Sequence, residues 1–277
     1  MTRASYAKIN LFLHVLGKRA DGYHDIYTLF YGINLHDDIE IIPAEKTNIL
    51  YADNSIKIYG RNIINEVDNL LRRECGLTQH FEVRLNKRIP IGAGLGGGSS
   101  NACTYMQLVN EQAHLGLTTD DMRQLLVRLG SDTAFFLYPP MALGEGRGEL
   151  LTPIKDAPRL NILMANPNIF VSTASIYGDA NLKLTEKGNL PKIPERFTLD
   201  WLVSNMKNDL EQPVFMKEPL VKQLKDELLS SGALNALMSG SGSTVFGVYR
   251  DCASLDRAYD ALRTKYASYK FFKCVAD

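Results

Sequence analysis

Residues 90–102 read PIGAGLGGGSSNA, and five of the seven residues from Gly92 to Gly98 are glycine. Glycine loses more backbone entropy on folding than any other residue, so this density is unfavourable unless the loop requires it. The next residues, SSNACTYMQLVNEQAHLG (99–116), have apolar side chains at helical spacing. Serines favour a helix N-terminus, and Gly116 is a typical terminator. The stretch therefore predicts a loop with almost no side chains that leads into a helix.

A flexible turn and three kinds of ligand-binding loop are compatible with these glycines. Gly92, Gly94 and Gly97 formally satisfy the GxGxxG dinucleotide-binding fingerprint, but NKRIPI separates the preceding strand from the first glycine. A P-loop requires a Gly-Lys-Ser or Gly-Lys-Thr ending, whereas this loop ends in GGGSSN. In the remaining interpretation, backbone N–H groups and the helix N-terminus surround a phosphate. Ser99 and Ser100 then cap the helix or offer hydroxyl groups to phosphate or Mg²⁺.

Composition and charge narrow the classes of function. The chain has 277 residues, and 31 basic side chains balance 31 acidic ones. Because nucleic-acid-binding proteins are usually basic, we expect no nucleic-acid partner. Four scattered cysteines without metal-site spacing predict free thiols in a reducing compartment. The N-terminus is typical of neither a signal nor a transit peptide, and no apolar run approaches the ~20 residues of a membrane span. We therefore expect a cytoplasmic protein with no membrane partner.

Strand and helix patterns alternate along the chain, which predicts a mixed α and β fold. Predicted strands cover residues 7–15, 25–42 (with a break near His36–Asp38), 80–90, 160–167, 243–250 and 270–276. Predicted helices cover residues 64–75, 99–116, 118–130, 218–232 and 251–267, and a short helix from Ser131 ends at Pro139 and Pro140. The buried strand at 160–167 follows a turn-rich stretch and is predicted to open a second domain. The predicted domains are therefore 1–154 and 155–277.

The glycine-rich stretch resembles the corresponding motif of the GHMP kinases, the superfamily of galacto-, homoserine, mevalonate and phosphomevalonate kinases. Five further blocks resemble the family in order and spacing: AKINLFL (7–13), RADGYHDIYTLF (19–30), LGSDTAFF (129–136), NDLE (208–211) and SGSGSTVFG (239–247). The resemblance implies a two-domain α+β fold with the active site in the cleft between the domains. It also implies ATP with Mg²⁺, a small-molecule acceptor whose hydroxyl group is phosphorylated, and a monomer or homodimer.

Two residues are candidates for the chemistry. Asp132 follows Gly130 and Ser131 at the start of a predicted helix, where the helix dipole favours an ionised carboxylate. From the pattern alone it is equally well an ordinary N-terminal helix acid. Lys8 alternates with Ile9 and Leu11 in the first strand, so it lies on an exposed edge or has a charged partner. The resemblance implies that Asp132 is catalytic and that Lys8 lies beside it and polarises the acceptor oxygen.

The resemblance also implies a cytidine group on the substrate. Asn10, on the same strand face as Lys8, then contacts the substrate, and Tyr23 with His24 binds the cytidine. Tyr177 stacks on cytosine, with Thr173 as a further polar contact. From the residues alone, His24 is as compatible with a surface position and Tyr177 with the core. The second glycine-rich turn, SGSGST (239–244), brings Gly240 and Gly242 towards the phosphates.

The remaining predicted contacts belong to ATP. They are Asn69, Lys87, Pro90, Gly92, Gly94, Leu95, Gly96, Gly97, Gly98, Ser99 and Ser100. For Lys87, a solvated position at a strand end is the alternative, and the metal ligands are unassigned. Three other functions are considered: a GHMP kinase whose substrate lacks a base, a non-catalytic sensor, and a nucleic-acid module. The Tyr-His pair argues against the first, retention of Lys8 with Asp132 against the second, and zero net charge against the third.

Overall fold

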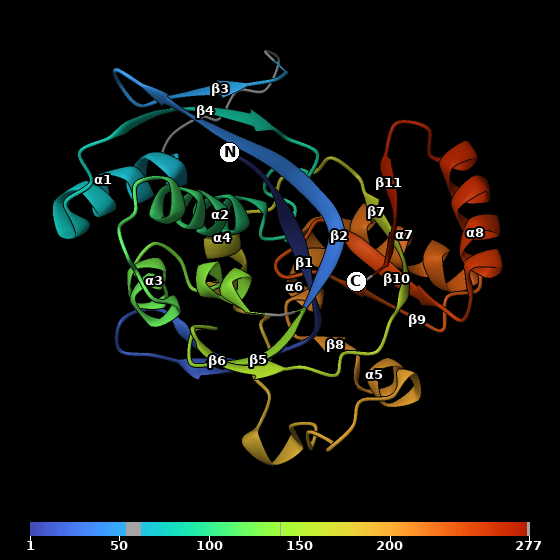
Figure 1. The fold of residues 1–277 in the computed structure, drawn as a ribbon. Helices are drawn as coiled ribbons and strands as arrows, with labels where there is room; N and C mark the ends of the chain where they lie inside the picture. The colour runs from blue at the N-terminus through green and yellow to red at the C-terminus, as the bar shows by residue number, and fades with distance from the viewer. Residues whose placement is uncertain (54–61, 139, 276–277) are drawn as a thin grey trace. The chain divides into compact units, whose positions relative to one another are not determined.

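The computed structural model describes residues 1–53, 62–138 and 140–275 (Figure 1). The chain forms two compact units: the first contains residues 1–7, 35–91 and 96–138, and the second contains residues 8–34, 92–95 and 139–277. Two long strands, β1 (Thr2–Lys18) and β2 (His24–Ala44), contribute residues to both units. The units are thus interleaved along the chain. The domain division between residues 154 and 155 stays a prediction.

Helix α2 (Gly97–Gln112) packs against three elements of the first unit: α1 (Ile63–Cys75), α3 (Thr119–Leu126) and the 3₁₀ helix Thr133–Leu137. Residues 100–106 of α2 are all buried, so this helix is covered all round, beyond the single apolar stripe that its sequence predicts. In the same unit, β4 (His80–Asn86) pairs antiparallel with residues 38–44 of β2. Strand β3 (Asn48–Tyr51) pairs parallel with β4.

Local capping fixes the ends of the helices in the first unit. The Asn62 side chain accepts a hydrogen bond from the Ile64 backbone at the start of α1, and Gly76 ends that helix with φ +69°. Thr118 and Asp121 form a reciprocal capping box at the start of α3. The predicted helix at 64–75 is therefore confirmed almost to the residue. The predicted helix at 118–130 is confirmed but ends at Leu126.

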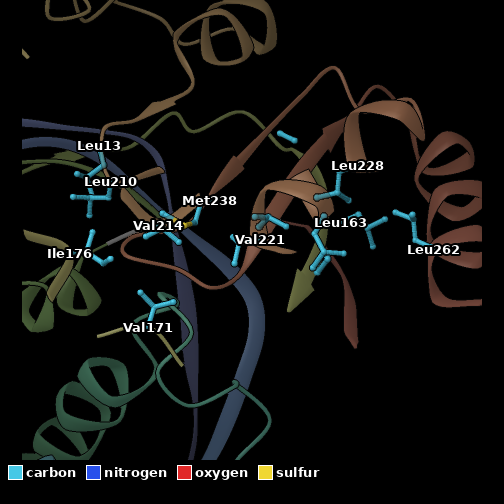
Figure 2. Packing of buried hydrophobic residues seen from close by; sticks show 14 of the residues in the cluster. Leu13, Leu163, Val171, Ile176, Leu210, Val214, Val221, Leu228, Met238 and Leu262 are labelled. Atoms are coloured by element: carbon cyan, nitrogen blue, oxygen red, sulfur yellow. The ribbon is translucent and has the colours of Figure 1, made fainter. Parts of the chain in front are cut away.

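The second unit contains a four-stranded antiparallel sheet in the order β11 (Lys270–Val275), β7 (Asn161–Asn166), β10 (Val245–Tyr249), β9 (Asn235–Met238). Helix α7 (Pro219–Ser230) packs on β9 and β10, and α8 (Cys252–Lys265) packs on β7 and β11. The core of this unit includes Leu163 from the sheet and Leu228 from α7, both fully buried (Figure 2). The predicted strand–helix–strand ending of the chain is confirmed.

The remaining elements of the second unit are short. They are β5 (Met141–Glu145), β6 (Leu150–Ile154), α4 (Thr173–Tyr177), the 3₁₀ helix Lys187–Asn189, α5 (Leu199–Asn205), β8 (Lys207–Asn208) and α6 (Glu211–Lys217). Strand β5 pairs antiparallel with both β2 and β6, and β8 pairs parallel with β1. None of the described helices has the length and apolar character that crossing a membrane requires.

Four local expectations are wrong or fall outside the described residues. The break near His36–Asp38 does not occur, because the buried Asp37 carboxylate receives hydrogen bonds from neighbouring groups and β2 continues through it. The short helix after Ser131 is a 3₁₀ helix beginning at Thr133. Pro139, expected at its end, and Ala276, expected in the last strand, lie outside the described residues.

Candidate active site

The N-terminus of α2 carries no side-chain cap in the described part of the chain. Gly96 is the N-cap residue, with φ +68°, and the helix begins at Gly97. The predicted capping role of Ser99 and Ser100 is therefore wrong, because both lie inside the first turn. The first N–H groups of a helix have no acceptor within the helix. With the glycines of the loop around them, these groups form the kind of helix end that binds phosphate.

Each of the two serines has a definite partner within the first unit. The Ser99 hydroxyl donates to Asp132 Oδ1 over 2.6 Å. The Ser100 hydroxyl is buried and lies 2.7 Å from the hydroxyl of Ser5. Asp132 directly precedes the 3₁₀ helix, and its side chain makes no capping hydrogen bond there. The Asp132 carboxylate is therefore oriented by Ser99 at the start of α2. An ordinary acid at a helix N-terminus would cap its own helix, and Asp132 does not.

Lys87 lies in a buried ion pair beneath the glycine-rich helix start. Its Nζ is 2.5 Å from Asp37 Oδ2 and donates to Asn101 Oδ1 over 3.1 Å. A Cβ placed on Gly97 would lie 3.3 Å from this Nζ, so the ammonium group directly underlies the first turn of α2. The Lys87 side chain is 6% exposed, and the solvated alternative is therefore wrong. The contact of Lys87 with ATP stays a prediction.

Three further predicted ATP contacts differ in how accessible they are. Asn69 is exposed on α1, and Pro90 is partly buried. Leu95 is 1% exposed, while its backbone oxygen accepts a hydrogen bond from the Lys8 backbone. Asn69 is therefore open to a ligand, whereas the Leu95 side chain belongs to the core. Their roles in binding ATP stay predictions.

Lys8 is 5% exposed, so its ammonium group requires oxygen partners. Its Nζ donates to Asn10 Oδ1 over 2.9 Å and to the Gly94 backbone oxygen over 3.1 Å. It also lies 5.6 Å from the centre of the Phe30 ring. The exposed-edge alternative for Lys8 is therefore wrong. Because Lys8 belongs to the second unit and Asp132 to the first, their pairing stays a prediction.

Thr28 fixes the orientation of Asn10, which the sequence did not indicate. The Asn10 side-chain amide donates to Thr28 Oγ1 over 2.8 Å, and the Thr28 hydroxyl donates to the Phe12 backbone oxygen over 2.7 Å. The Asn10 carbonyl oxygen is thereby directed at Lys8. Alternation within the predicted strand at 25–42 places Thr28 and Phe30 on one face. This alternation is the sequence pattern from which their place beside Asn10 and Lys8 could have been predicted.

The second glycine-rich turn packs against the first. Gly94 has φ +76°, and a Cβ there would lie 2.1 Å from the Ser239 backbone oxygen. The Ser239 hydroxyl donates to the Gly94 oxygen over 2.9 Å, and the Thr244 backbone N–H donates to the Ala93 oxygen over 3.3 Å. A Cβ on Gly240 would in turn lie 3.2 Å from the Gly94 oxygen. Glycine is thus needed in both turns because the two backbones approach closely.

Glycine is needed at position 242 for a similar steric reason, since a Cβ there would lie 2.7 Å from the Met238 sulfur. In the glycine loop itself, a Cβ on Gly92 would lie 2.9 Å from the Phe170 ring. Contacts of Gly240 and Gly242 with phosphate stay predictions.

His24 and Tyr177 lie side by side in the second unit. Their ring centres are 5.2 Å apart and the ring planes are inclined by 33°. His24 begins β2, and Tyr177 ends α4, whose N-cap is Ser172. Burial, and secondarily the charge of Lys18, lowers the pKa of His24. A neutral imidazole has one donor and one acceptor, which suits hydrogen bonding to the edge of a nucleobase.

Tyr23 is 54% exposed, and its ring centre lies 4.8 Å from the guanidinium carbon of Arg147. This cation–π contact holds the tyrosine ring at the surface of the second unit. Arg147, in the turn-rich GEGRGE segment, was not among the predicted site residues. Thr173 is exposed, and its hydroxyl lies 2.7 Å from that of Ser241. The cytidine contacts of Tyr23 and Thr173 stay predictions.

No group of three or more His, Cys, Asp or Glu side chains that suits a metal ion occurs among residues 1–53, 62–138 and 140–275. Mg²⁺ in phosphoryl-transfer enzymes is commonly held by one or two protein oxygens together with the nucleotide phosphates. The hydrogen-bonded Ser99 and Asp132 offer a hydroxyl and a carboxylate beside the open end of α2. They are therefore suited to Mg²⁺ that is carried by ATP.

Comparison with known proteins identifies the family of the chain. Residues 62–139 match the GHMP kinases N terminal domain, and residues 190–268 match the GHMP kinases C terminal domain. The chain belongs to the GHMP kinase family, with its mixed α+β fold.

Several relatives that resemble the chain over most of its length share one name. The chain is 40% identical to the 4-diphosphocytidyl-2-C-methyl-D-erythritol kinase of Geobacter sp. (strain M21), with 88% of each chain covered. It is 35% identical to the kinase of that name from Thermoanaerobacter pseudethanolicus, with 99% of this chain and 95% of the relative covered. A crystal structure of 4-(cytidine 5'-diphospho)-2C-methyl-D-erythritol kinase matches over the whole of both chains, with a TM-score of 0.82 and 30% identity.

Proposed function

We propose that the protein is a 4-diphosphocytidyl-2-C-methyl-D-erythritol kinase. It transfers the γ-phosphoryl group of ATP to the 2-hydroxyl group of this substrate, a step in non-mevalonate isoprenoid precursor biosynthesis. The observation that carries the proposal is the contact between His24 and Tyr177, which provides a hydrogen-bonding imidazole beside an aromatic ring. Kinases for homoserine or mevalonate act on substrates without a base and have no need of this pair. The shared name of relatives that span most of the chain supports the same substrate.

Recognition of the cytidine rests on neutral His24. The lowered pKa keeps the imidazole uncharged at pH 7, so one ring nitrogen donates to the cytosine edge and the other accepts. Tyr177 contributes base stacking, which is typically worth ~1–3 kcal/mol. Tyr23, held by Arg147, bounds the base from the surface. We infer that the acceptor end of the substrate lies towards Lys8 and Asn10.

Phosphoryl transfer depends mainly on positioning and on stabilisation of charge. The free N–H groups at the start of α2 bind the ATP phosphates, and the glycines allow the backbone to approach them. Ser99 and Asp132 would hold Mg²⁺, which would supply positive charge that neutralises the ATP phosphates. Asp132 orients the acceptor hydroxyl group or accepts its proton. Lys8, held by Asn10 and the Gly94 oxygen, stabilises the negative charge that develops on the acceptor oxygen.

The test is a coupled ADP-release assay with Mg-ATP and 4-diphosphocytidyl-2-C-methyl-D-erythritol, with homoserine, mevalonate and galactose in parallel. We expect turnover with the cytidylated substrate alone. Asp132→Asn and Lys8→Met are expected to lower kcat by at least ~10², the scale of general acid–base catalysis. Asp120→Asn, at an exposed aspartate on α3, is the matched control and keeps wild-type turnover.

Ser99→Ala removes the hydrogen bond to Asp132 and is expected to lower kcat more than it raises the KM for the cytidylated substrate. Turnover with a substrate that lacks a base would show that the protein is a kinase but would refute the proposed cytidine site. Absence of turnover with all four acceptors would favour a sensor that binds ATP. A cytoplasmic location and a monomeric or homodimeric state stay predictions.

A further inference from the structure

A cavity of about 610 Å³ lies wholly within the second unit, between the segment that precedes the 3₁₀ helix Lys187–Asn189 and the region of β8, α6 and α7. None of the residues that we assign to the kinase site lines it. We propose that this cavity binds a small carboxylate anion with an apolar chain. Its volume is within the range of pockets that hold small molecules, ~300–1,000 Å³. The inference is independent of the kinase reaction.

Three lysines in the lining provide positive charge. Lys183 is exposed and has no ion-pair partner within the described ranges of the chain. Lys207 pairs with Asp209 over 2.9 Å and Lys222 pairs with Asp226 over 2.6 Å, but both lysine side chains are more than half exposed. The Lys222–Asp226 pair is exposed on both sides and contributes little to stability, so the Lys222 ammonium group can turn towards a ligand at low cost. Lys207 stays with the buried carboxylate of Asp209.

The two acidic residues of the lining do not cancel this charge, because protein groups already occupy their oxygens. Asp209 Oδ2 accepts hydrogen bonds from the Val15 backbone and the Thr185 hydroxyl, and Oδ1 faces Lys207. The partly buried Glu211 accepts a hydrogen bond from the Met238 backbone with Oε1 and pairs with Lys225 through Oε2. The ammonium group of Lys183 is the charge left uncompensated, and it favours a monoanion.

The apolar residues of the lining indicate that the ligand carries an apolar group in addition to its charge. Leu184 is 52% exposed and Met216 is 61% exposed, although both are large apolar side chains at the cavity. Phe215, also in the lining, is partly buried against the core of the unit. Covering exposed apolar surface contributes roughly 25 cal/mol per Å². A short alkyl chain on the anion would cover Leu184 and Met216 while its carboxylate faces the lysines.

The test titrates the full-length protein with hexanoate and follows methyl signals of Leu184 and Met216 by NMR. Acetate supplies the charge without the chain, and hexanol supplies the chain without the charge. We expect hexanoate to shift both methyl signals at concentrations at which acetate and hexanol do not. Lys183→Glu is expected to weaken hexanoate binding by about fivefold, since one exposed charge contact is worth up to ~1 kcal/mol. Lys187→Glu, an exposed lysine outside the lining, is the matched control and keeps wild-type affinity.

Leu184→Ser tests the apolar wall separately and is expected to weaken hexanoate binding while leaving the folded spectrum unchanged elsewhere. Equal binding of hexanoate to the wild type and Lys183→Glu would overturn the proposal. So would shifts confined to residues outside the cavity, or acetate binding as tightly as hexanoate. Loss of kinase activity in the assay above would not affect this result, because binding is read at the cavity itself.

Discussion

Replacement of Gly94 by alanine is expected to destabilise the protein and to slow the reaction, because this position combines two steric constraints. Its φ of +76° lies in the left-handed region, where a Cβ costs about 1–2 kcal/mol. The added Cβ would also lie 2.1 Å from the Ser239 oxygen and 3.1 Å from the Gly242 oxygen. Both obstacles are backbone atoms, so no side-chain rotation relieves the overlap.

The magnitude follows from these two terms. Overpacking of a filled site typically costs about 1–3 kcal/mol, so the total loss in unfolding free energy is about 2–5 kcal/mol. Gly22→Ala is the matched control, because Gly22 has φ +86° in the same unit and a Cβ there meets no atom within 4 Å. The control has only the backbone term. At about 2–4 °C per kcal/mol, Gly94→Ala should melt roughly 2–12 °C below Gly22→Ala.

The assay is thermal unfolding of both variants and the wild type, followed by steady-state kinetics of Gly94→Ala. Movement of Gly94 also displaces the oxygen that holds Lys8 Nζ, and a misplacement of about 1 Å at a reacting group can lower kcat by ~10². Melting temperatures of the two variants within about 2 °C of each other would refute the reasoning about close backbone approach. Unchanged kcat in Gly94→Ala would show that the Gly94 oxygen does not position Lys8.

Other features of the structure lead to three further predictions. Leu228→Ala, in the core of the second unit, should lower the free energy of unfolding in urea by about 2–5 kcal/mol. Leu220→Ala, at a side chain that is 46% exposed on the same helix, should change it by no more than about 0.5 kcal/mol. Equal losses in the two variants would contradict the packing in Figure 2. Burial lowers the pKa of His14 from its ordinary value of 6.5. The unfolded chain therefore binds this proton first, and the unfolding free energy falls as pH drops below about 6.5. His14→Phe should flatten that decline, and parallel pH profiles would contradict the assignment. Lys87→Met leaves the buried Asp37 without its ion-pair partner and should lower the free energy of unfolding in urea by about 3–5 kcal/mol. Lys222→Met, at an exposed ion pair, is the control and should lower it by about 0–1 kcal/mol.

Several features of the protein were determined by the sequence itself because they depend on near neighbours. The density of glycine from Gly92 to Gly98 predicts the loop before α2, and the helical spacing over residues 118–130 predicts α3, which begins at Thr119 after its N-cap Thr118. Alternation along the first strand places Lys8 and Asn10 on one face, where they form a hydrogen bond. Motif order along the chain was also enough to indicate the family.

Only the tertiary structure decided which distant groups these residues meet. Lys8 obtains its second oxygen from Gly94, 86 residues away, and Asp132 receives the Ser99 hydroxyl over a separation of 33 residues. The sequence left Ser99 either as a helix cap or as a hydroxyl group for phosphate or Mg²⁺, and the structure excludes the cap because the helix begins two residues earlier, at Gly97. Capping and alternation depend on neighbours in the chain, whereas buried polar groups are satisfied by whatever partner the packed fold brings within hydrogen-bond distance. The partners of Lys8, Lys87 and Asp132 therefore follow from packing.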